Sequence, residues 1–134
     1  MLLATLRSVL VRAIETEFAS QNIDLSFTQH LILEKLQELG VVSATVLARA
    51  VVLDSGAMTR QLDHLERKGY LGRAPHTQDR RALRLELTEA GHTKSRDMAC
   101  ISSGRVMTAA QRTLEVGERA QLRDYLERVL GLAV

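Results

Sequence analysis

The sequence predicts a mainly α-helical fold that contains one small β-hairpin. Apolar residues recur at helical spacing over most of the 134 residues, and Ser, Thr or Asp stands at the start of several of these stretches. A clear alternation of apolar and charged residues occurs at 83–87, "LRLEL". A helical period places apolar side chains on one face of a helix, whereas a period of two marks a half-buried strand. The length fits a single domain, which we assign to residues 1–134.

Two helices are predicted at the start of the chain. The first, over residues 2–20, is amphipathic. Ser26 and Gln29 have the spacing of a capping box, and they open a second helix that ends at Gly40. The apolar residues with helical spacing in the first helix are Leu3, Leu6, Leu10, Ile14 and Phe18.

A pair of shorter helices is predicted next. Ser43 caps a helix of two turns that ends near Ala50, and Asp54 or Ser55 caps another that runs to about Lys68. The turn between them contains Val52, which is β-branched and should avoid a positive φ. Two short helices joined by a tight turn form a helix-turn-helix candidate. The apolar face of the second helix is formed by Met58, Leu62 and Leu65, opposite Gly56, Thr59, Arg60, Asp63 and Arg67.

A hairpin and two long helices complete the chain. Strands are expected at 71–74 and 83–87, with residues 75–81 as their loop, and Thr88 caps a helix over about 89–111. A last helix covers about 116–131. A helix-turn-helix followed by a hairpin is a winged helix, here over about 26–88. The terminal helices, about 2–20 and 89–131, carry surplus apolar surface, which we expect a second subunit to cover.

The charge distribution points to a polyanionic partner. The net charge is only +2, but residues 67–84 hold six basic residues and one acidic residue, a local charge of +5. The single cysteine, Cys100, allows no internal disulfide, and no apolar run suits a membrane span or a signal peptide. We therefore expect a cytoplasmic protein without a membrane partner.

The positions of the polar residues favour binding to double-stranded DNA. The start of the second short helix would present Ser55, Gly56, Thr59 and Arg60 to a major groove. Arg80 and Arg81 in the hairpin loop would suit the negative potential of a narrow minor groove. Asp79 would brace this wing by pairing with Arg81 or with Arg73. Alternatively, the same face is solvated and contacts nothing.

The stretch from Leu53 to Gly91, "LDSGAMTRQLDHLERKGYLGRAPHTQDRRALRLELTEAG", resembles the MarR family of bacterial transcriptional regulators. The matching features are "MTRQLDHLERKGY", the "DRR" of the wing and "LTEAG", in fixed order and spacing. The resemblance implies a homodimer whose terminal helices interlock. It implies binding to a pseudo-palindromic operator, mostly as a repressor, with release by a small aromatic or phenolic ligand or by an oxidant. It also places DNA contacts at the residues named above.

Three positions depart from the family pattern, and one of them is Val52, which stands in the turn between the two short helices where the family often has Gly. His76 and Thr77 stand where the family often has Asp-Pro, so the φ angle of the wing is not fixed there by proline. His30 lies in the region where family ligands often bind, although a partly buried interface histidine fits the sequence as well. Cys100 is expected to be buried and inert, unless the two copies of its helix meet in a dimer.

The sequence contains no pattern of an enzyme or of a cofactor site. No nucleotide-binding glycine loop, nucleophile elbow or metal-ligand pair of His or Cys occurs in it. We therefore expect a regulator without a cofactor or metal and without enzymatic activity. Two alternatives remain: a winged-helix module that binds an acidic protein, and a regulator that responds to no effector.

Overall fold

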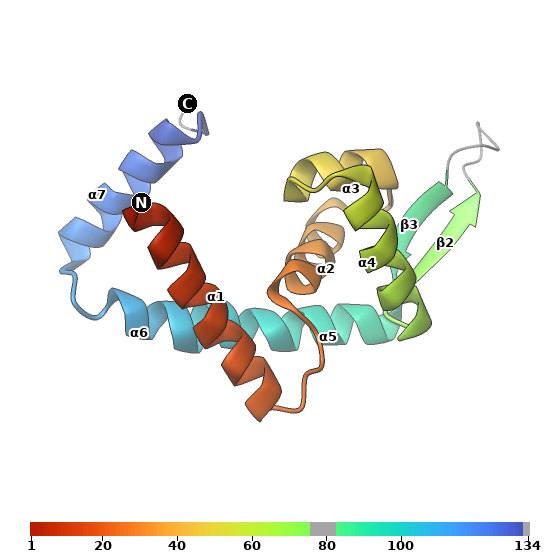
Figure 1. Cartoon of the computed structure of the whole chain (residues 1–134), viewed down its shortest axis with the longest axis horizontal. Coiled ribbons are helices and arrows are strands. Elements are labelled where there is room, and N and C mark those ends of the chain that lie inside the picture. The colour runs from red at the N-terminus through yellow and green to blue at the C-terminus, as the bar shows by residue number, and fades with distance from the viewer. Residues whose placement is uncertain (76–82, 133–134) are drawn as a thin grey trace.

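The computed structural model describes residues 1–75 and 83–132, and in these ranges it has the predicted helices and an antiparallel three-stranded sheet (Figure 1). The mainly helical fold with a hairpin is confirmed. The helices are α1 (Leu2–Ser20), α2 (Phe27–Leu39), α3 (Ala44–Val51), α4 (Ser55–Arg67), α5 (Glu89–Ala99), the π-helical segment η1 (Cys100–Val106), α6 (Met107–Gln111) and α7 (Val116–Val129). The strands are β1 (Val42–Ser43), β2 (Leu71–Pro75) and β3 (Leu83–Leu87).

Side-chain caps start the helices where the sequence predicts them. Each capping oxygen accepts a hydrogen bond from a backbone N–H in the first turn, which satisfies one of the donors that a helix start leaves unpaired. Of the two candidates for α4, Asp54 is the cap. The bonds are Gln29 N to Ser26 Oγ (3.2 Å), Val46 N to Ser43 Oγ (3.3 Å), Ala57 N to Asp54 Oδ1 (2.8 Å) and Gly91 N to Thr88 Oγ1 (3.1 Å).

The turn between α3 and α4 differs from the prediction. Val52 has φ 57° and ψ 53°, the left-handed conformation that its branched side chain was expected to exclude. Leu53 N donates to Ala48 O at 3.0 Å, a bond that closes the end of α3 around Val52. The Val52 side chain is 88% exposed and meets no packing obstacle. The prediction was wrong because this closing bond and the geometry of the turn outweigh the backbone preference of one residue.

Strand β3 lies in the middle of the sheet, between β1 and β2. The sequence did not predict β1, whose two residues pair with Leu85 and Arg84. Leu71 lies opposite Leu87, and Arg73 lies opposite Leu85. Residues directly opposite each other share one face of a sheet, so Arg73 is on the same face as the buried Leu85.

The core joins the helix-turn-helix to the sheet and to the long helices. The aliphatic side chains predicted on α4 belong to it: Met58, Leu62 and Leu65 are all buried. α5 closely approaches the connection between α4 and β2 at Gly91, where an added Cβ would lie 1.9 Å from the backbone oxygen of Tyr70. Glycine is therefore required at this position of "LTEAG". Other large core residues are Phe18, Ile32, Leu33, Leu36, Leu47, Leu85 and Met98.

The long helix after the sheet is not α-helical throughout. It spans 89–111 as predicted, but its middle part, Cys100–Val106, is a π-helix. π-helical turns are rare and occur frequently at functional sites. Here the segment packs beside α1 and carries Ser102 into the core next to α2.

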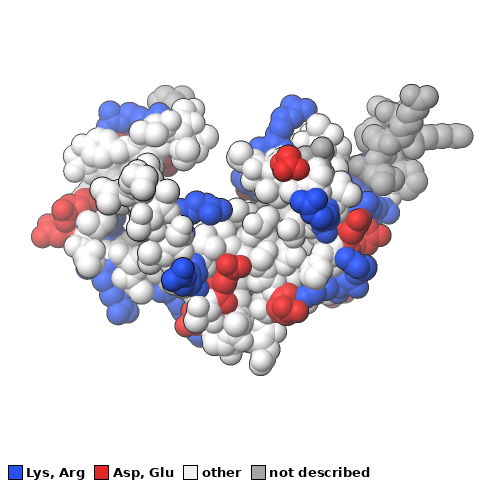
Figure 2. Space-filling model, in the orientation of Figure 1, with Lys and Arg blue, Asp and Glu red and all other residues white. Residues whose placement is uncertain are grey.

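The two ends of the chain form an arm that lies apart from the winged helix (Figure 1). Large apolar residues at the start of α1 and along α7 are exposed, among them Leu2 at 87%, Val9 at 60% and Leu130 at 68%. In Figure 2 uncharged atoms cover much of this arm between its charged groups, and charged residues of both signs also lie over the lobe of α3, α4 and β2. The surplus apolar surface predicted for the terminal helices is thus present and uncovered in the single chain.

Candidate nucleic-acid interface

Helix α4 presents its polar face to solvent at its N-terminal half. Burial of Met58, Leu62 and Leu65 fixes which side of the helix faces the core. Gly56, Thr59 and Arg60 lie on the exposed side, and Ser55 is the first residue of the helix. The helix therefore offers a short stretch of small and hydrogen-bonding residues followed by a cation. These are suitable groups for contact with base edges and phosphate.

Gly56 keeps the start of α4 narrow. A Cβ at this position would lie 3.3 Å from Asp54 Oδ1, the oxygen that caps the helix, and 4.0 Å from Arg60 Nη1. A side chain here would crowd the cap. Its absence leaves the backbone of the first turn open to close approach by a ligand such as a phosphate.

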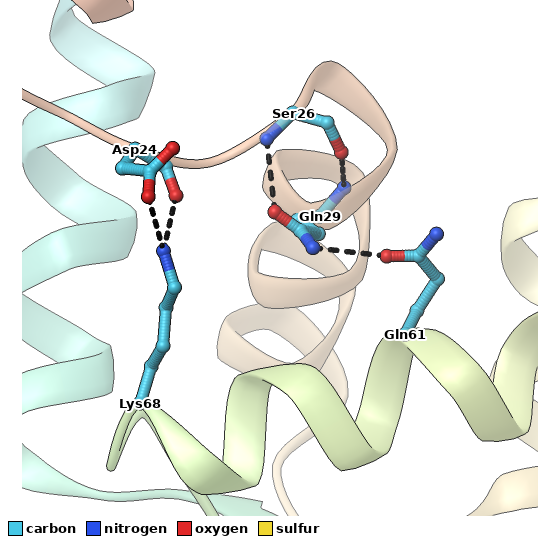
Figure 3. A network of polar contacts seen from close by, with 5 residues as sticks. All are labelled: Asp24, Ser26, Gln29, Gln61 and Lys68. Carbon is cyan, nitrogen blue, oxygen red and sulfur yellow. Dashed lines mark hydrogen bonds and ion pairs between the residues drawn. The ribbon is translucent and has the colours of Figure 1, made fainter.

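One flank of α4 is tied to the start of α2 by two polar contacts, here called the α2 clamp (Figure 3). Gln29 Nε2 donates to Gln61 Oε1 at 3.0 Å, while Gln29 Oε1 accepts from Ser26 N at 2.9 Å. Lys68 Nζ lies 2.5 Å from the backbone oxygen of Asp24 and 3.1 Å from its Oδ2. The capping box of α2 thus also positions Gln29, whose side chain contacts Gln61 of α4.

The other flank of α4 is tied to the wing strand β2 by the wing clamp. Arg73 Nη2 donates to Asp63 Oδ1 at 2.6 Å, and Arg73 Nε lies 2.6 Å from Glu66 Oε2. The sequence predicted Arg73 as a wing-structuring residue and, with Arg81, as one of two alternative partners of Asp79. Asp79 lies outside the described residues, and among the described residues the Arg73 guanidinium contacts two carboxylates of α4.

The tip of the wing lies outside the described residues. This applies to Arg80 and Arg81, to Asp79, and to His76 and Thr77. Their proposed roles stay predictions from the sequence. The structure describes the two strands on either side, which pair in register from Leu71 opposite Leu87 to Pro75 opposite Leu83.

His30 is buried in a pocket between α1, α2 and η1. Its Nε2 is 3.0 Å from Ser102 Oγ, and its ring packs against Phe18 and Phe27. Nδ1 is buried without a hydrogen-bond partner among the described residues. Burial lowers the pKa of His30 below the ordinary value of 6.5, and the nearby Glu34 carboxylate partly opposes this effect. The neutral imidazole is therefore the favoured form in the folded protein.

The pocket beside His30 has a volume of about 360 Å³. Its walls are mainly aliphatic, and its few polar groups include the His30 ring, Ser102 and Glu34. Such a cavity has the size and lining of a site for a small, largely apolar molecule. The remaining lining residues are Leu3, Leu6, Arg7, Leu10, Val11, Ile14, Phe27, Leu31, Ser103 and Met107.

The expected burial of Cys100 was wrong, because its side chain is exposed at the start of η1. Its neighbours in the helix, Met98 and Ile101, take the inward positions instead. Within residues 1–75 and 83–132, no cluster of three or more His, Cys, Asp or Glu side chains could hold a metal ion. None of the helices in those ranges is long and apolar enough to cross a membrane.

The contacts on both flanks of α4 were not predicted from the sequence. Local signals existed for part of the wing clamp: Asp63 and Glu66 are three residues apart and so share one flank of a helix. Arg73 also occupies the core-facing register of its strand, where an apolar residue is usual. No local signal pairs Gln29 with Gln61, because these residues meet only when α2 and α4 pack.

Comparison with known proteins agrees with this geometry. The sequence profile of the MarR family matches residues 25–83. The HTH-type transcriptional regulator SarZ of Staphylococcus haemolyticus is 37% identical over 68 residues, which are 51% of this chain and 46% of the relative. The multiple antibiotic resistance protein MarR of Salmonella typhimurium is 33% identical over 69 residues, 52% of this chain and 48% of that protein. The chain thus matches about half the length of these curated relatives.

Solved structures extend the similarity to nearly the whole chain. A mutant MarR from E. coli complexed with operator DNA has a TM-score of 0.86 at 25% identity, with 96% of this chain and 91% of that chain covered. The reduced form of MarR from E. coli has a TM-score of 0.85 at 24% identity, with coverage of 96% and 93%, and shows the shared fold. The matched segment contains the helix-turn-helix and its flanking strands, so the chain is similar to the MarR family in sequence over residues 25–83 and in fold over nearly its whole length.

Proposed function

We propose that this protein is a DNA-binding transcriptional regulator that reads an operator through α4 and through the wing at 75–81. The observation that carries the proposal is the geometry of α4: its start is capped and exposed, and both of its flanks are fixed by polar clamps. The similarity to a MarR solved with operator DNA supports it. In this role Thr59 and Arg60 contact base edges, while Ser55 and Gly56 bring the backbone close to phosphate.

The proposed regulator is a homodimeric repressor that binds a pseudo-palindromic site. The uncovered apolar residues of α1 and α7 support dimerisation, because surfaces of this kind are normally buried against another chain. A two-fold dimer places two copies of α4 on successive turns of the same DNA face, so half-sites about 10 base pairs apart are expected. Sedimentation equilibrium at micromolar concentration should give the mass of a dimer.

The pocket beside His30 is the proposed site for a small aromatic or phenolic effector that releases DNA. His30 lines this mainly aliphatic cavity, and its Nδ1 has no hydrogen-bond partner among the described residues, so it offers a hydrogen-bonding group to a ligand. A phenol could fill the apolar volume and satisfy that nitrogen. Binding at this position, between α1, α2 and η1, would alter how the arm packs on the winged helix. A thermal shift screen tests this point, because a ligand that binds only the folded state raises the melting temperature.

The central test is a mobility-shift assay with DNA from upstream of the protein's own gene. The proposal predicts a discrete complex at about 150 mM salt that an unrelated duplex does not compete away, because base readout adds to the non-specific attraction. Binding seen only at very low salt, without preference for sequence, would instead favour a winged-helix module with an acidic protein partner. Equal affinity for every duplex would show that the protein does not recognise a specific operator sequence.

A further inference from the structure

We propose that Arg73 is a positioning residue for DNA binding, which sets the orientation of the wing relative to the recognition helix α4. The inference rests on the proposed DNA-binding function. It differs from a role in DNA contact, because Arg73 faces the protein: its side chain is only 24% exposed and its guanidinium lies 2.6 Å from each of two carboxylates of α4.

The wing clamp is a two-point contact. Arg73 Nη2 donates a hydrogen bond to Asp63 Oδ1 at 2.6 Å, whereas Nε lies 2.6 Å from Glu66 Oε2 in an ion pair that lacks the geometry of a hydrogen bond. The hydrogen bond to Asp63 fixes the direction of the planar guanidinium group, and the ion pair with Glu66 adds an attraction from a second point of the helix, so together they restrict the placement of the strand on α4. A lysine ammonium group in the same place would be a point charge without this directional control.

The position of Arg73 in the sheet makes these partners necessary. Arg73 lies opposite Leu85 on the core-facing side of β2, where a charge without partners would be costly. The carboxylates of Asp63 and Glu66 place opposite charge beside this position, and Asp63 also accepts a hydrogen bond from Nη2. The clamp therefore favours one placement of the hairpin on α4 over neighbouring ones that would bury similar apolar surface.

The opposite flank shows why this contact matters for the wing. Gln61 and Lys68 are seven residues apart and lie on one side of α4, where the α2 clamp holds them. Those contacts fix α4 on the helical core but do not involve the hairpin. Arg73 connects α4 to β2, the strand that leads in sequence to Arg80 and Arg81.

The decisive variant removes the partners and keeps Arg73. Asp63→Asn with Glu66→Gln takes two negative charges from the recognition helix, which by electrostatics alone would strengthen binding to DNA. Loss of positioning predicts the opposite, an affinity about tenfold weaker for an operator duplex from the upstream region. Fluorescence anisotropy titrations at salt concentrations between about 50 and 300 mM measure both the affinity and its salt dependence. Unchanged or stronger binding would overturn the proposal.

Two substitutions of Arg73 complete the test. Arg73→Met keeps a long apolar stem for packing and should weaken binding by about tenfold with an unchanged salt slope, and Arg73→Lys by about threefold. A slope reduced by about one would mean that Arg73 itself neutralises a phosphate, which would contradict the positioning role. Arg96→Ala, an exposed arginine of α5, is the matched control and should bind like the wild type.

Stability measurements separate failure of the clamp from failure of the proposed function. Urea unfolding of the Arg73→Met variant, the Asp63→Asn and Glu66→Gln variant and their combination forms a double-mutant cycle. The clamp predicts that the effects on the unfolding constant are non-additive by about fivefold. Additive effects would overturn the clamp. Non-additive effects together with a wild type that binds no operator would overturn the DNA-binding function and leave the clamp in place.

Discussion

His30 Nε2 and Ser102 Oγ lie 3.0 Å apart in the core, so that a buried imidazole of α2 is joined to the π-helical segment η1. The π-helical turn places Ser102 at this point of the long helix. The contact joins α2, which carries Gln29 of the α2 clamp, to η1, which continues through α6 toward the terminal arm. It therefore lies where the winged helix and the proposed dimerisation region meet.

The first prediction concerns pH. Because burial lowers the pKa of His30, the unfolded chain takes up a proton below about pH 6.5 that the folded protein binds less readily. Stability from this residue is present above pH 6.5 and is lost as the pH falls, by at most about 1.4 kcal/mol per pH unit. Urea unfolding at several pH values between about 5 and 8 measures the effect.

The control for this prediction is His30→Gln, which can still bond to Ser102 but does not titrate. Its stability should depend less on pH than that of the wild type over the same range. Equal slopes for the two proteins would show that His30 does not contribute. Protein concentration is held constant, since the stability of a dimer depends on it.

The second prediction concerns the close approach of α5 to Tyr70. Gly91→Ala would place a methyl group 1.9 Å from a backbone oxygen, which cannot move aside as the end of a side chain can. We expect a loss of at least about 3 kcal/mol in the free energy of unfolding, because backbone must shift in a packed region. Gly104→Ala, in the same long helix but with open space around it, should cause no such loss. Similar stabilities of the two variants would refute this account of Gly91.

The third prediction concerns the left-handed residue between α3 and α4. Val52→Gly should raise the free energy of unfolding by about 0.5 kcal/mol, because relief of the left-handed strain exceeds the entropy that glycine adds to the unfolded chain. Val52→Ala keeps a Cβ and should gain less. Chemical denaturation of all three proteins gives the order. A glycine variant less stable than the wild type would mean that the valine side chain contributes contacts that its 88% exposure does not suggest.

The fourth prediction concerns the wing tip. Arg80→Ala with Arg81→Ala should weaken binding to operator and non-operator DNA alike and lower the magnitude of the salt slope by about two, since each phosphate contact releases about one counterion. Titrations at several salt concentrations measure this slope. Wild-type affinity and slope in the double variant would contradict the wing assignment. Arg112→Ala with Arg119→Ala, far along the chain from the wing, provides a control for the loss of two charges.

The parts of the fold with local signals were predictable from the sequence. Caps such as Ser26 and Thr88, the helical spacing of α1 and α4, and the alternation of β3 all act within a few residues of the chain, and the structure agrees with them. Strand β1 has only two residues, too few for a period. The π-helical turn and the exposure of Cys100 depend on how the long helix packs against α1 and α2.

The candidate site was predictable in its location but not in its supporting contacts. The exposed face of α4 follows from the spacing of Met58, Leu62 and Leu65. The partners of Arg73 do not, because "DRR" offered an acidic residue nearer in the sequence than Asp63 and Glu66. Val52 likewise shows that the conformation of one residue follows from the turn that its neighbours close.

The most direct test of DNA reading by α4 is the affinity of Arg60→Ala for the operator and for variants with single base changes. If Arg60 contacts a base, the substitution costs about 1–3 kcal/mol with the operator and removes the preference at one position of each half-site. The wild type should prefer the operator over a scrambled duplex by a factor of about 10³ or more at physiological salt. Equal affinity of the wild type for both duplexes would contradict sequence-specific DNA binding by this protein.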